Sequence, residues 1–196
     1  MNICLLGPNN RRIIETLQMH GDRVWCTEER ILLEELEPAG IEFIVSYKYR
    51  YLIRQPILEK FERKLINLHI SYLPWNRGAD PNLWSFLEDT PKGVTIHYID
   101  SGLDTGDIIA QKMVEFSPQD TLKTSYEHLT ATIEDLFLAQ WPSIRSGKAE
   151  GTVQPAGGSY HRTADKQRFA HLLTDSWETP IERILGKGQI SKTTEG

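Results

Sequence analysis

Short apolar runs alternate with segments of helical periodicity along the first part of the chain. Residues 2–6, 24–26 and 41–45 are apolar runs typical of buried strands, and residues 11–20 and 31–36 between them space apolar side chains as a helix does. Consecutive strands that are joined through helices pair in parallel, with the helices on both faces of the sheet. The pattern therefore predicts an α/β fold with a mostly parallel, Rossmann-like sheet.

The alternation continues into the second half of the chain. The further predicted elements are a short helix at 56–61, strands at 65–70, 94–99 and 108–116, a helix that begins at Pro81, and a long helix from Asp120 or Thr121 to Trp141. Proline suits the first turn of a helix, because its missing N–H has no partner to lose there. Trp84 and Phe86 fall on the helix after Pro81, so we interpret them as core residues.

Composition changes near residue 146. A chain of 196 residues with 39% hydrophobic residues fits one domain better than two. We predict a main domain of residues 1–145 and a C-terminal extension, 146–196, that packs on it. The stretch 146–163 is rich in Gly and polar residues, at most two short helices are expected after Ala164, and the terminal GQISKTTEG is expected to be disordered.

Charge and cysteine content exclude several classes of protein. A net charge of −5 and a pI of about 5.7 argue against nucleic-acid binding over a broad basic face. Cys4 and Cys26 lie in apolar surroundings without paired spacing, so we expect reduced core thiols and a cytoplasmic setting. The sequence has neither a signal peptide nor a run of about 18 apolar residues, so no membrane association is expected.

The apolar strand at 65–70, LINLHI, contains two polar residues, Asn67 and His69. Because they are two positions apart on a strand, both side chains point to the same face. In open parallel sheets, reacting groups gather near the C-terminal ends of strands, where this pair stands. An amide and an imidazole that converge on one oxygen are suitable donors for an oxyanion hole. Taken alone, the pair is better explained as two hydrogen-bonded core residues.

Two nearby loops favour the functional interpretation. The loop at 71–81, SYLPWNRGADP, contains too much Gly, Pro and Arg for a simple connector, and its length is typical of a binding rim. The segment at 100–108, DSGLDTGDI, which we call the acid loop, contains three carboxylates and two glycines in nine residues. Such a composition is expected where a tight loop carries one acid into a cleft.

The combined motifs resemble a known family of enzymes. NLHISYLPWNRGADPNLW followed by GVTIHYIDSGLDTGDIIAQ is similar to the core of the 10-formyltetrahydrofolate-dependent formyltransferases, which act on methionyl-tRNA, glycinamide ribonucleotide or nucleotide-linked amino sugars. The resemblance covers about residues 44–116 and joins four motifs in order, N-x-H, L-P-x-x-R-G-x-x-P, G-V-T-x-H and L-D-T-G-D. It implies the formyltransferase core fold and 10-formyltetrahydrofolate as cosubstrate, without a metal.

The resemblance also implies catalytic roles for Asn67, His69 and Asp104. Formyl transfer from N10 of the folate to an amine passes through a tetrahedral oxyanion, so the site needs hydrogen-bond donors and a proton acceptor. Asn67 would donate to the oxyanion, and His69, expected as an imidazolium beside Asp104, would donate a stronger bond and help move the proton. Asp104 would orient His69 and hold a water that relays protons.

Further residues are candidates for binding the two substrates. The resemblance places contacts to the pterin after the strand at 41–45 and beside the acid loop. The predicted cofactor-binding residues are Ser46, Tyr47, Tyr49, Gly102, Leu103, Thr105 and Gly106, and the predicted substrate-binding residues are Trp75, Arg77, His97 and Tyr160. Arg77 either binds a phosphate or locks its own loop, and His97 either faces the cleft or makes a structural hydrogen bond.

The acceptor is predicted by elimination. Only 66 residues precede Asn67, about one βα unit of ~30 residues fewer than the resemblance leads us to expect, and the turn GPNNRRI lacks a Gly-rich phosphate loop. Both features argue against glycinamide ribonucleotide. The acidic charge and the missing C-terminal domain of the tRNA enzymes argue against tRNA. A nucleotide-linked amino sugar is the acceptor that remains.

Three alternatives stay open. They are a hydrolase that releases formate from the same cosubstrate, another amine formyltransferase of the glycinamide ribonucleotide or methionyl-tRNA type, and a folate-binding module without turnover. We also expect a homodimer formed through the long helix or the tail. Residues 157–166, GGSYHRTADK, either cover the sugar site or pack the tail.

Overall fold

The structure, a computed structural model, describes residues 1–188. The strands are β1 (Asn2–Leu6), β2 (Arg23–Thr27), β3 (Phe43–Tyr47), β4 (Leu65–His69), β5 (Arg77–Gly78), β6 (Gly93–Tyr98), β7 (Ile108–Met113) and β8 (Tyr160–His161). The helices are α1 (Arg11–Met19), α2 (Leu33–Leu36), α3 (Ile57–Lys60), α4 (Pro81–Leu87) and α5 (Leu122–Arg145), followed by three 3-10 helices, η1 (Asp165–Leu172), η2 (Ser176–Glu178) and η3 (Ile181–Arg183). Apart from the two-residue strands β5 and β8, every strand lies within a few residues of its predicted place.

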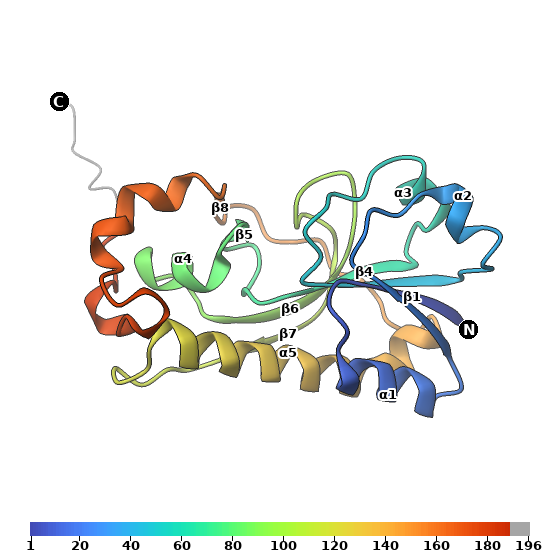
Figure 1. Cartoon of the computed structure of the whole chain (residues 1–196), viewed down its shortest axis with the longest axis horizontal. Coiled ribbons are helices and arrows are strands. Elements are labelled where there is room, and N and C mark those ends of the chain that lie inside the picture. Colours follow the sequence, from blue (N-terminus) through green and yellow to red (C-terminus); the bar gives the residue numbers. More distant parts are fainter. Residues whose placement is uncertain (189–196) are drawn as a thin grey trace.

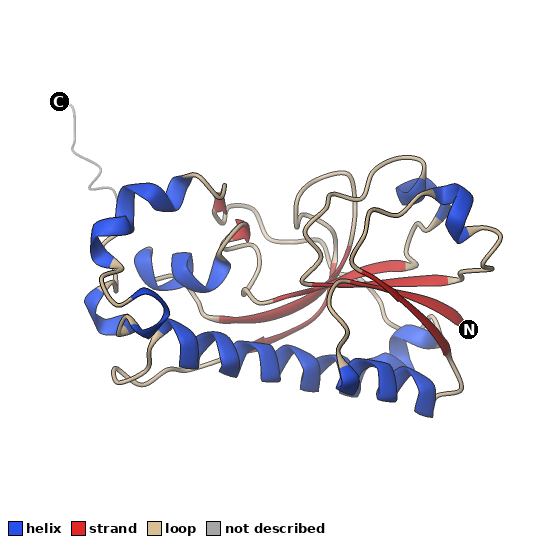
Figure 2. Ribbon diagram, in the orientation of Figure 1, coloured by secondary structure: helices blue, strands red, loops and turns tan. Residues whose placement is uncertain are grey.

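Six strands form one sheet in the order β2-β1-β3-β4-β6-β7. The first four are parallel, whereas β6 runs antiparallel to β4, and β7 antiparallel to β6. The prediction of an α/β fold with a mostly parallel sheet is therefore confirmed, with an antiparallel hairpin added at one edge. The sheet lies at the centre of the molecule, with α2 and α3 above it and α1 and α5 below it in Figures 1 and 2.

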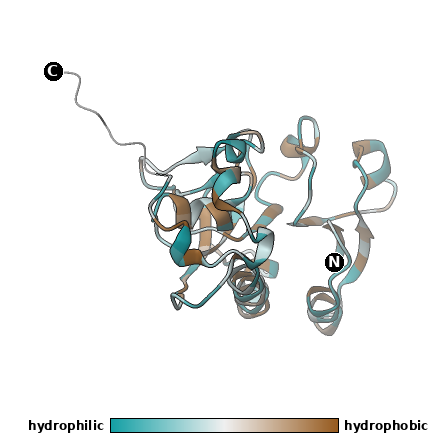
Figure 3. Ribbon diagram, turned by 60° about the vertical axis from the view of Figure 1, so that its left-hand side comes forward, coloured by the Kyte–Doolittle hydropathy of each residue, from teal (hydrophilic) through white to brown (hydrophobic). Residues whose placement is uncertain are grey.

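Alternate residues of each strand supply two separate cores. Ile3 and Leu5 of β1 point toward α1 and α5 and join a cluster that includes Phe137 and Trp141. Cys4 and Leu6 point to the other face and pack with residues of α2 and α3. This alternation is what a parallel strand covered on both faces requires. Hydrophobic and hydrophilic stretches alternate along the covering helices (Figure 3), because each helix buries one side only.

The antiparallel direction of β6 determines where the acid loop begins, because the end of β6 lies beside the start of β4. Ile66 lies opposite Tyr98 in the β4–β6 ladder, and the Ile99 N–H donates to the carbonyl oxygen of Leu65 at 2.9 Å. The loop at 99–107 therefore leaves the sheet beside the start of β4. It must fold back toward the C-terminal half of β4 to reach Asn67.

The C-terminal extension packs on the rest of the chain. β8 pairs in parallel with β5, and a cluster of apolar side chains joins α4 and the start of α5 to Ile181 and Ile184. Trp84 and Phe86 are buried in this cluster, as predicted. The ring of His161 stacks on Trp84 with centroids 3.8 Å apart, so this part of the 157–166 stretch packs the tail.

The structure bears on the predictions for the C-terminal segment, the two cysteines and membrane-spanning helices. Three 3-10 helices follow Ala164, so the prediction of at most two short helices there is wrong. The predicted disorder of the last residues falls almost wholly on 189–196, which lie outside the described residues. Cys4 is buried, Cys26 is partly buried, and both are free thiols. No helix in residues 1–188 has the length and apolarity needed to cross a membrane.

Candidate active site

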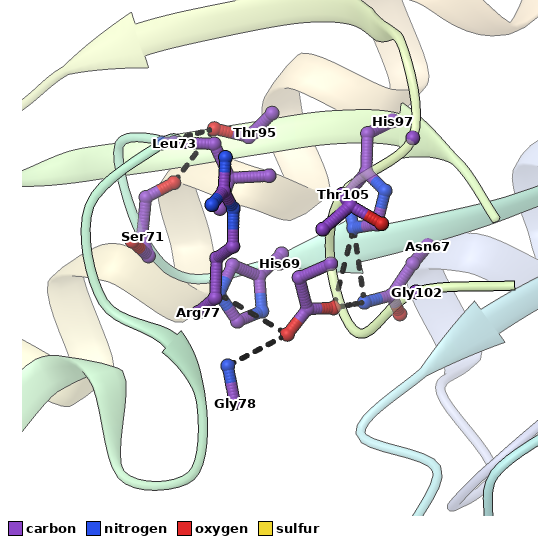
Figure 4. Close-up of polar contacts among 12 residues, drawn as sticks. Asn67, His69, Ser71, Leu73, Arg77, Gly78, Thr95, His97, Gly102 and Thr105 are labelled. Atoms are coloured by element: carbon purple, nitrogen blue, oxygen red, sulfur yellow. Dashed lines mark hydrogen bonds and ion pairs between the residues drawn. The ribbon is translucent and has the colours of Figure 1, made fainter. Parts of the chain in front are cut away.

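Four polar groups surround the carboxylate of Asp104. The side-chain amide of Asn67 donates to its Oδ1 at 3.2 Å, and the backbone N–H of Gly78 donates to its Oδ2 at 2.9 Å. His97 Nε2 lies 3.4 Å from Oδ1, and His69 Nε2 lies 3.9 Å from Oδ2. Figure 4 shows these groups converging from three segments of the chain. The structure thus brings together Asn67, His69 and Asp104, which the sequence singled out as a set.

Strand geometry places the two histidines and the amide. Asn67 and His69 project from one face of β4 because they are two positions apart. Asn67 and His97 are Cα partners in the antiparallel β4–β6 ladder, so their side chains lie side by side. Only 1% of His97 is exposed, which favours a role in holding Asp104 over direct contact with a substrate.

The acid loop has a backbone conformation that restricts its sequence. Asp104 has a φ of +54°, in the left-handed region. A Cβ atom at Gly106 would lie 2.0 Å from the carbonyl oxygen of Tyr98, so only glycine fits at this close approach. The left-handed backbone of Asp104 and the close approach at Gly106 together direct the Asp104 carboxylate toward β4.

The predicted cofactor residues of the acid loop mostly hold the loop itself. The carboxylate of Asp100 accepts hydrogen bonds from the Gly102 N–H at 3.0 Å and from the Thr105 hydroxyl at 2.7 Å. The side chain of Leu103 is 36% exposed and is the apolar surface that this loop offers.

Burial sets the protonation states of the site. It lowers the pKa of His69, which the negative charge of Asp104 offsets only in part. Burial alone would raise the pKa of Asp104, but His69, His97 and the Gly78 N–H together hold it well below its usual range. At neutral pH the direction of these two shifts favours a neutral His69 beside an ionised Asp104. This corrects the expectation of an imidazolium at His69.

The tautomer of His97 follows from its partners. Its Nδ1 lies 2.7 Å from the carbonyl oxygen of Tyr98, which can only accept a hydrogen bond, so Nδ1 is assigned the proton. Its Nε2 lies 3.4 Å from Asp104 Oδ1 and 3.4 Å from the amide nitrogen of Asn67. The contact with Asn67 is long, which leaves the second N–H of the Asn67 amide available to a ligand.

Gln154 holds the acid loop from the C-terminal extension. Its Nε2 donates to the carbonyl oxygens of Asp104 and Gly106 at 2.8 and 2.9 Å. Its Oε1 accepts from Arg77 Nε at 3.1 Å and Nη2 at 2.7 Å. Arg77 therefore contacts the side chain that also binds the acid loop. Sequence reasoning missed Gln154, because an isolated glutamine in a Gly-rich stretch belongs to no periodic pattern or motif.

The remaining predicted substrate residues lie around Gly78. Trp75 is partly buried, and its carbonyl oxygen accepts a hydrogen bond from the hydroxyl of Ser71. Tyr160 is 49% exposed on β8, and a Cβ atom at Gly78 would lie 3.0 Å from its ring. Tyr160 thus stands beside the peptide group that holds Asp104.

Of the residues predicted to contact the pterin, Ser46 lies beside Asn67, whereas the side chain of Tyr47 lies on the other side of the sheet. Ser46 is buried and is the Cα partner of Asn67. The side chain of Tyr47 points to α5, where its hydroxyl donates to Glu134 at 2.7 Å, and burial raises the pKa of its phenol. Only the backbone of Tyr47 therefore remains for contact with a ligand.

Tyr49 lines a cavity of about 530 Å³. Three arginines, Arg30, Arg50 and Arg54, line the same cavity. The guanidinium groups of Arg30 and Arg50 lie 4.8 and 5.0 Å from the ring centroid of Tyr51. The cavity is therefore cationic and aromatic, a combination that suits an anionic ligand with a flat ring. Among residues 1–188, no group of three His, Cys, Asp or Glu side chains is arranged to hold a metal ion.

Two curated relatives share about half of this chain. Over 97 residues, 49% of the chain, it is 39% identical to phosphoribosylglycinamide formyltransferase of Bacillus subtilis and spans 50% of that enzyme. Over 107 residues, 54% of the chain, it is 38% identical to methionyl-tRNA formyltransferase of Finegoldia magna and spans 34% of that enzyme. The chain therefore matches half or less of the length of each.

A solved structure matches nearly the whole chain. The formyltransferase PseJ from Anoxybacillus kamchatkensis, in complex with UDP-4,6-dideoxy-4-formamido-L-AltNAc and tetrahydrofolate, superimposes with a TM-score of 0.93 at 53% identity. The match covers 96% of this chain and 100% of that one. In addition, the formyl transferase family model matches residues 24–139, more than half of the chain. The chain thus belongs to the formyl transferase family.

Proposed function

We propose that the protein transfers a formyl group from 10-formyltetrahydrofolate to the amine of a small acceptor, a nucleotide-linked amino sugar. The observation that carries the proposal is the convergence of Asn67, His69 and His97 on the carboxylate of Asp104. That arrangement supplies an amide donor, a neutral imidazole and a carboxylate within one small volume.

Each group has a distinct task in the transfer. The acceptor amine attacks the formyl carbon, a C–N bond forms, and the Asn67 amide donates to the oxygen as it becomes an oxyanion. The neutral His69 accepts a proton from the attacking nitrogen, and the Asp104 carboxylate stabilises the resulting imidazolium. The proton then passes to N10 as its bond to the formyl carbon breaks, which returns His69 to its neutral form.

Two observations support the choice of substrates. PseJ was crystallised with a formylated UDP-sugar and tetrahydrofolate, and it aligns with this chain over its whole length. The cavity around Tyr49 is lined by Arg30, Arg50 and Arg54, which fit the carboxylates of a folate's glutamate tail. The net charge of −5 disfavours tRNA as the acceptor.

The test is formyl transfer from 10-formyltetrahydrofolate to a panel of nucleotide-linked amino sugars. Formylated sugar is detected by its mass gain and tetrahydrofolate by its release, with His69→Ala and Asp104→Asn as inactive controls. Product from the unmutated protein alone supports the proposal. Tetrahydrofolate with free formate would instead identify a hydrolase, and folate binding without turnover would identify a binding module.

We propose further that residues 1–145 form the catalytic domain and that 146–196 form an extension, which contributes Gln154 to the site. We also propose a cytoplasmic homodimer that associates through α5 or the tail. The free thiols Cys4 and Cys26 support a reducing compartment. Light scattering that gives a monomer at working concentration would refute the dimer, and cell fractionation tests the location.

A further inference from the structure

Asn76 is a fully buried polar residue in the loop between β4 and β5. Its side-chain amide contacts two hydroxyl groups from distant parts of the chain. Nδ2 donates to the hydroxyl of Thr90 at 2.8 Å, and Oδ1 accepts from the hydroxyl of Ser159 at 3.1 Å. The hydroxyl of Ser159 also accepts from the backbone N–H of Asn76 at 3.0 Å. Both ends of the amide are therefore fixed, one by the segment after α4 and one by the C-terminal extension.

The backbone of Asn76 faces the proposed catalytic histidine. Its carbonyl oxygen lies 3.4 Å from His69 Nε2, and Asp104 Oδ2 lies 3.9 Å from the same nitrogen. Both oxygens can only accept, so in the neutral ring Nε2 is assigned the proton and Nδ1 the lone pair. Asn76 has a φ of +56°, a left-handed conformation that asparagine adopts more readily than most residues. The direction of its carbonyl therefore depends on a backbone conformation that the side chain anchors.

The extension closes on this loop through backbone contacts as well. A Cβ atom at Gly158 would lie 2.0 Å from the carbonyl oxygen of Pro74. The Arg77 N–H donates to the carbonyl oxygen of Ser159 at 3.0 Å. Ser159 is thus held against the loop on both sides of Asn76. A chain of direct contacts runs from the extension through Ser159 and Asn76 to the imidazole ring.

We propose that Asn76 is a positioning residue for His69. Its side chain, held by Thr90 and Ser159, fixes the carbonyl that faces Nε2 and so keeps Nδ1 unprotonated for the acceptor amine. Asn76 itself neither takes a proton nor needs to contact a substrate. The inference rests on the proposed function, since His69 is the proton acceptor of that reaction.

The test is NMR of the full chain with isotope-labelled histidine, which reports the position of the proton on each imidazole ring. His69→Asn identifies the His69 signals. In the unmutated protein at neutral pH we expect the form with the proton on Nε2. Asn76→Gly still allows the left-handed conformation but loses both hydroxyl contacts, and it is expected to give a mixture of the two tautomers.

Thr90 supplies a second probe that leaves Asn76 in place. Thr90→Val has the shape of threonine without the hydroxyl, so it is expected to change the tautomer in the same direction as Asn76→Gly. Thr90→Ser keeps the hydroxyl and should retain the form with the proton on Nε2. The matched control is Asp89→Gly, at an exposed position with a φ of +50°, which should change nothing. Thermal unfolding of each variant separates a changed ring from lost folding.

Steady-state formyl transfer gives the catalytic consequence. Asn76→Gly is expected to lower kcat about tenfold, with the acceptor KM changed little. Loss of the carbonyl contact also lowers the pKa of His69, so the acidic limb of the kcat/KM profile should move to lower pH. The ionisable neighbours of His69, Asp104 and His97, are unchanged in every variant.

The outcomes separate this inference from the proposed reaction. A proton on Nδ1 in the unmutated protein would overturn the assignment. An unchanged tautomer in folded Asn76→Gly and Thr90→Val would also overturn it, whatever the turnover. A tautomer that depends on both residues, without formylation of any sugar, would keep the assignment and refute the proposed reaction.

Discussion

Gln154→Ala is expected to reduce turnover, although Gln154 is not proposed to contact a substrate. Four hydrogen bonds are lost, two to the carbonyl oxygens of Asp104 and Gly106 and two from Arg77. At about 0.5–1.5 kcal/mol each, they sum to roughly 2–6 kcal/mol, and the lower end applies because the contacts are only part-buried. The acid loop then loses its tether, so the population with Asp104 against Asn67 falls.

The assay combines urea unfolding with steady-state formyl transfer. We expect the free energy of unfolding to fall by about 2 kcal/mol and kcat to fall about tenfold, with the acceptor KM changed little. Gln154→Glu keeps the contact with Arg77 but faces two carbonyl oxygens with a carboxylate, so it should be no better than alanine. Gln18→Ala, at an exposed position of α1, is the matched control. Wild-type kcat in a folded Gln154→Ala would refute the tether.

Three further predictions concern the ionisable side chains of Asp104, His69 and Arg54. Asp104→Asn should lower kcat by about 10²–10⁴-fold while the protein stays folded, measured by initial rates beside circular dichroism. Because the folded pKa of His69 is lowered, wild-type stability should decline as pH falls below about 6.5, where the unfolded chain takes up the proton first. His69→Asn should flatten that decline in urea titrations at several pH values. Arg54→Ala should raise the KM for 10-formyltetrahydrofolate severalfold at low salt and less at high salt, whereas the exposed Arg11→Ala should leave it unchanged.

The six strands of the main sheet were predictable because each has a local apolar pattern. The apolar run of β1 and the spacing of apolar residues in α1 need no knowledge of distant residues. The antiparallel placement of β6 was not predictable in the same way, since an apolar run has the same appearance in either direction. The two-residue pair β5–β8 has no pattern at all, because it joins residues more than eighty positions apart.

The residues of the candidate site also differ in whether local sequence could predict them. Asn67, His69 and Asp104 stand in motifs, so a single sequence brings them to attention. The position of His97 depends on the register of β4 against β6, which places it opposite Asn67. The neutral state of His69 depends on burial, which local sequence does not determine.

The reversal of β6 explains why the acid loop depends on the extension, and Gly78 offers a test of this dependence. The loop starts beside Leu65 and reaches Asn67 only by folding back, with the Gly78 N–H as one of its anchors. A Cβ atom at Gly78 would lie 2.4 Å from the carbonyl oxygen of His161. Gly78→Ala should therefore push β5 away from β8 and move the anchor from Asp104.

Gly21→Ala is the matched control for Gly78→Ala. Both glycines have a positive φ, +78° and +88°, but a Cβ atom at Gly21 meets nothing within 4 Å. Both substitutions should cost about 1–2 kcal/mol of stability from the left-handed backbone, measured by urea unfolding. Gly78→Ala alone should add a loss of turnover, with kcat reduced and the pH profile shifted as Asp104 loses a donor. Equal turnover in the two folded variants would mean that Asp104 is held by its own loop, and that pairing with the extension is not needed for catalysis.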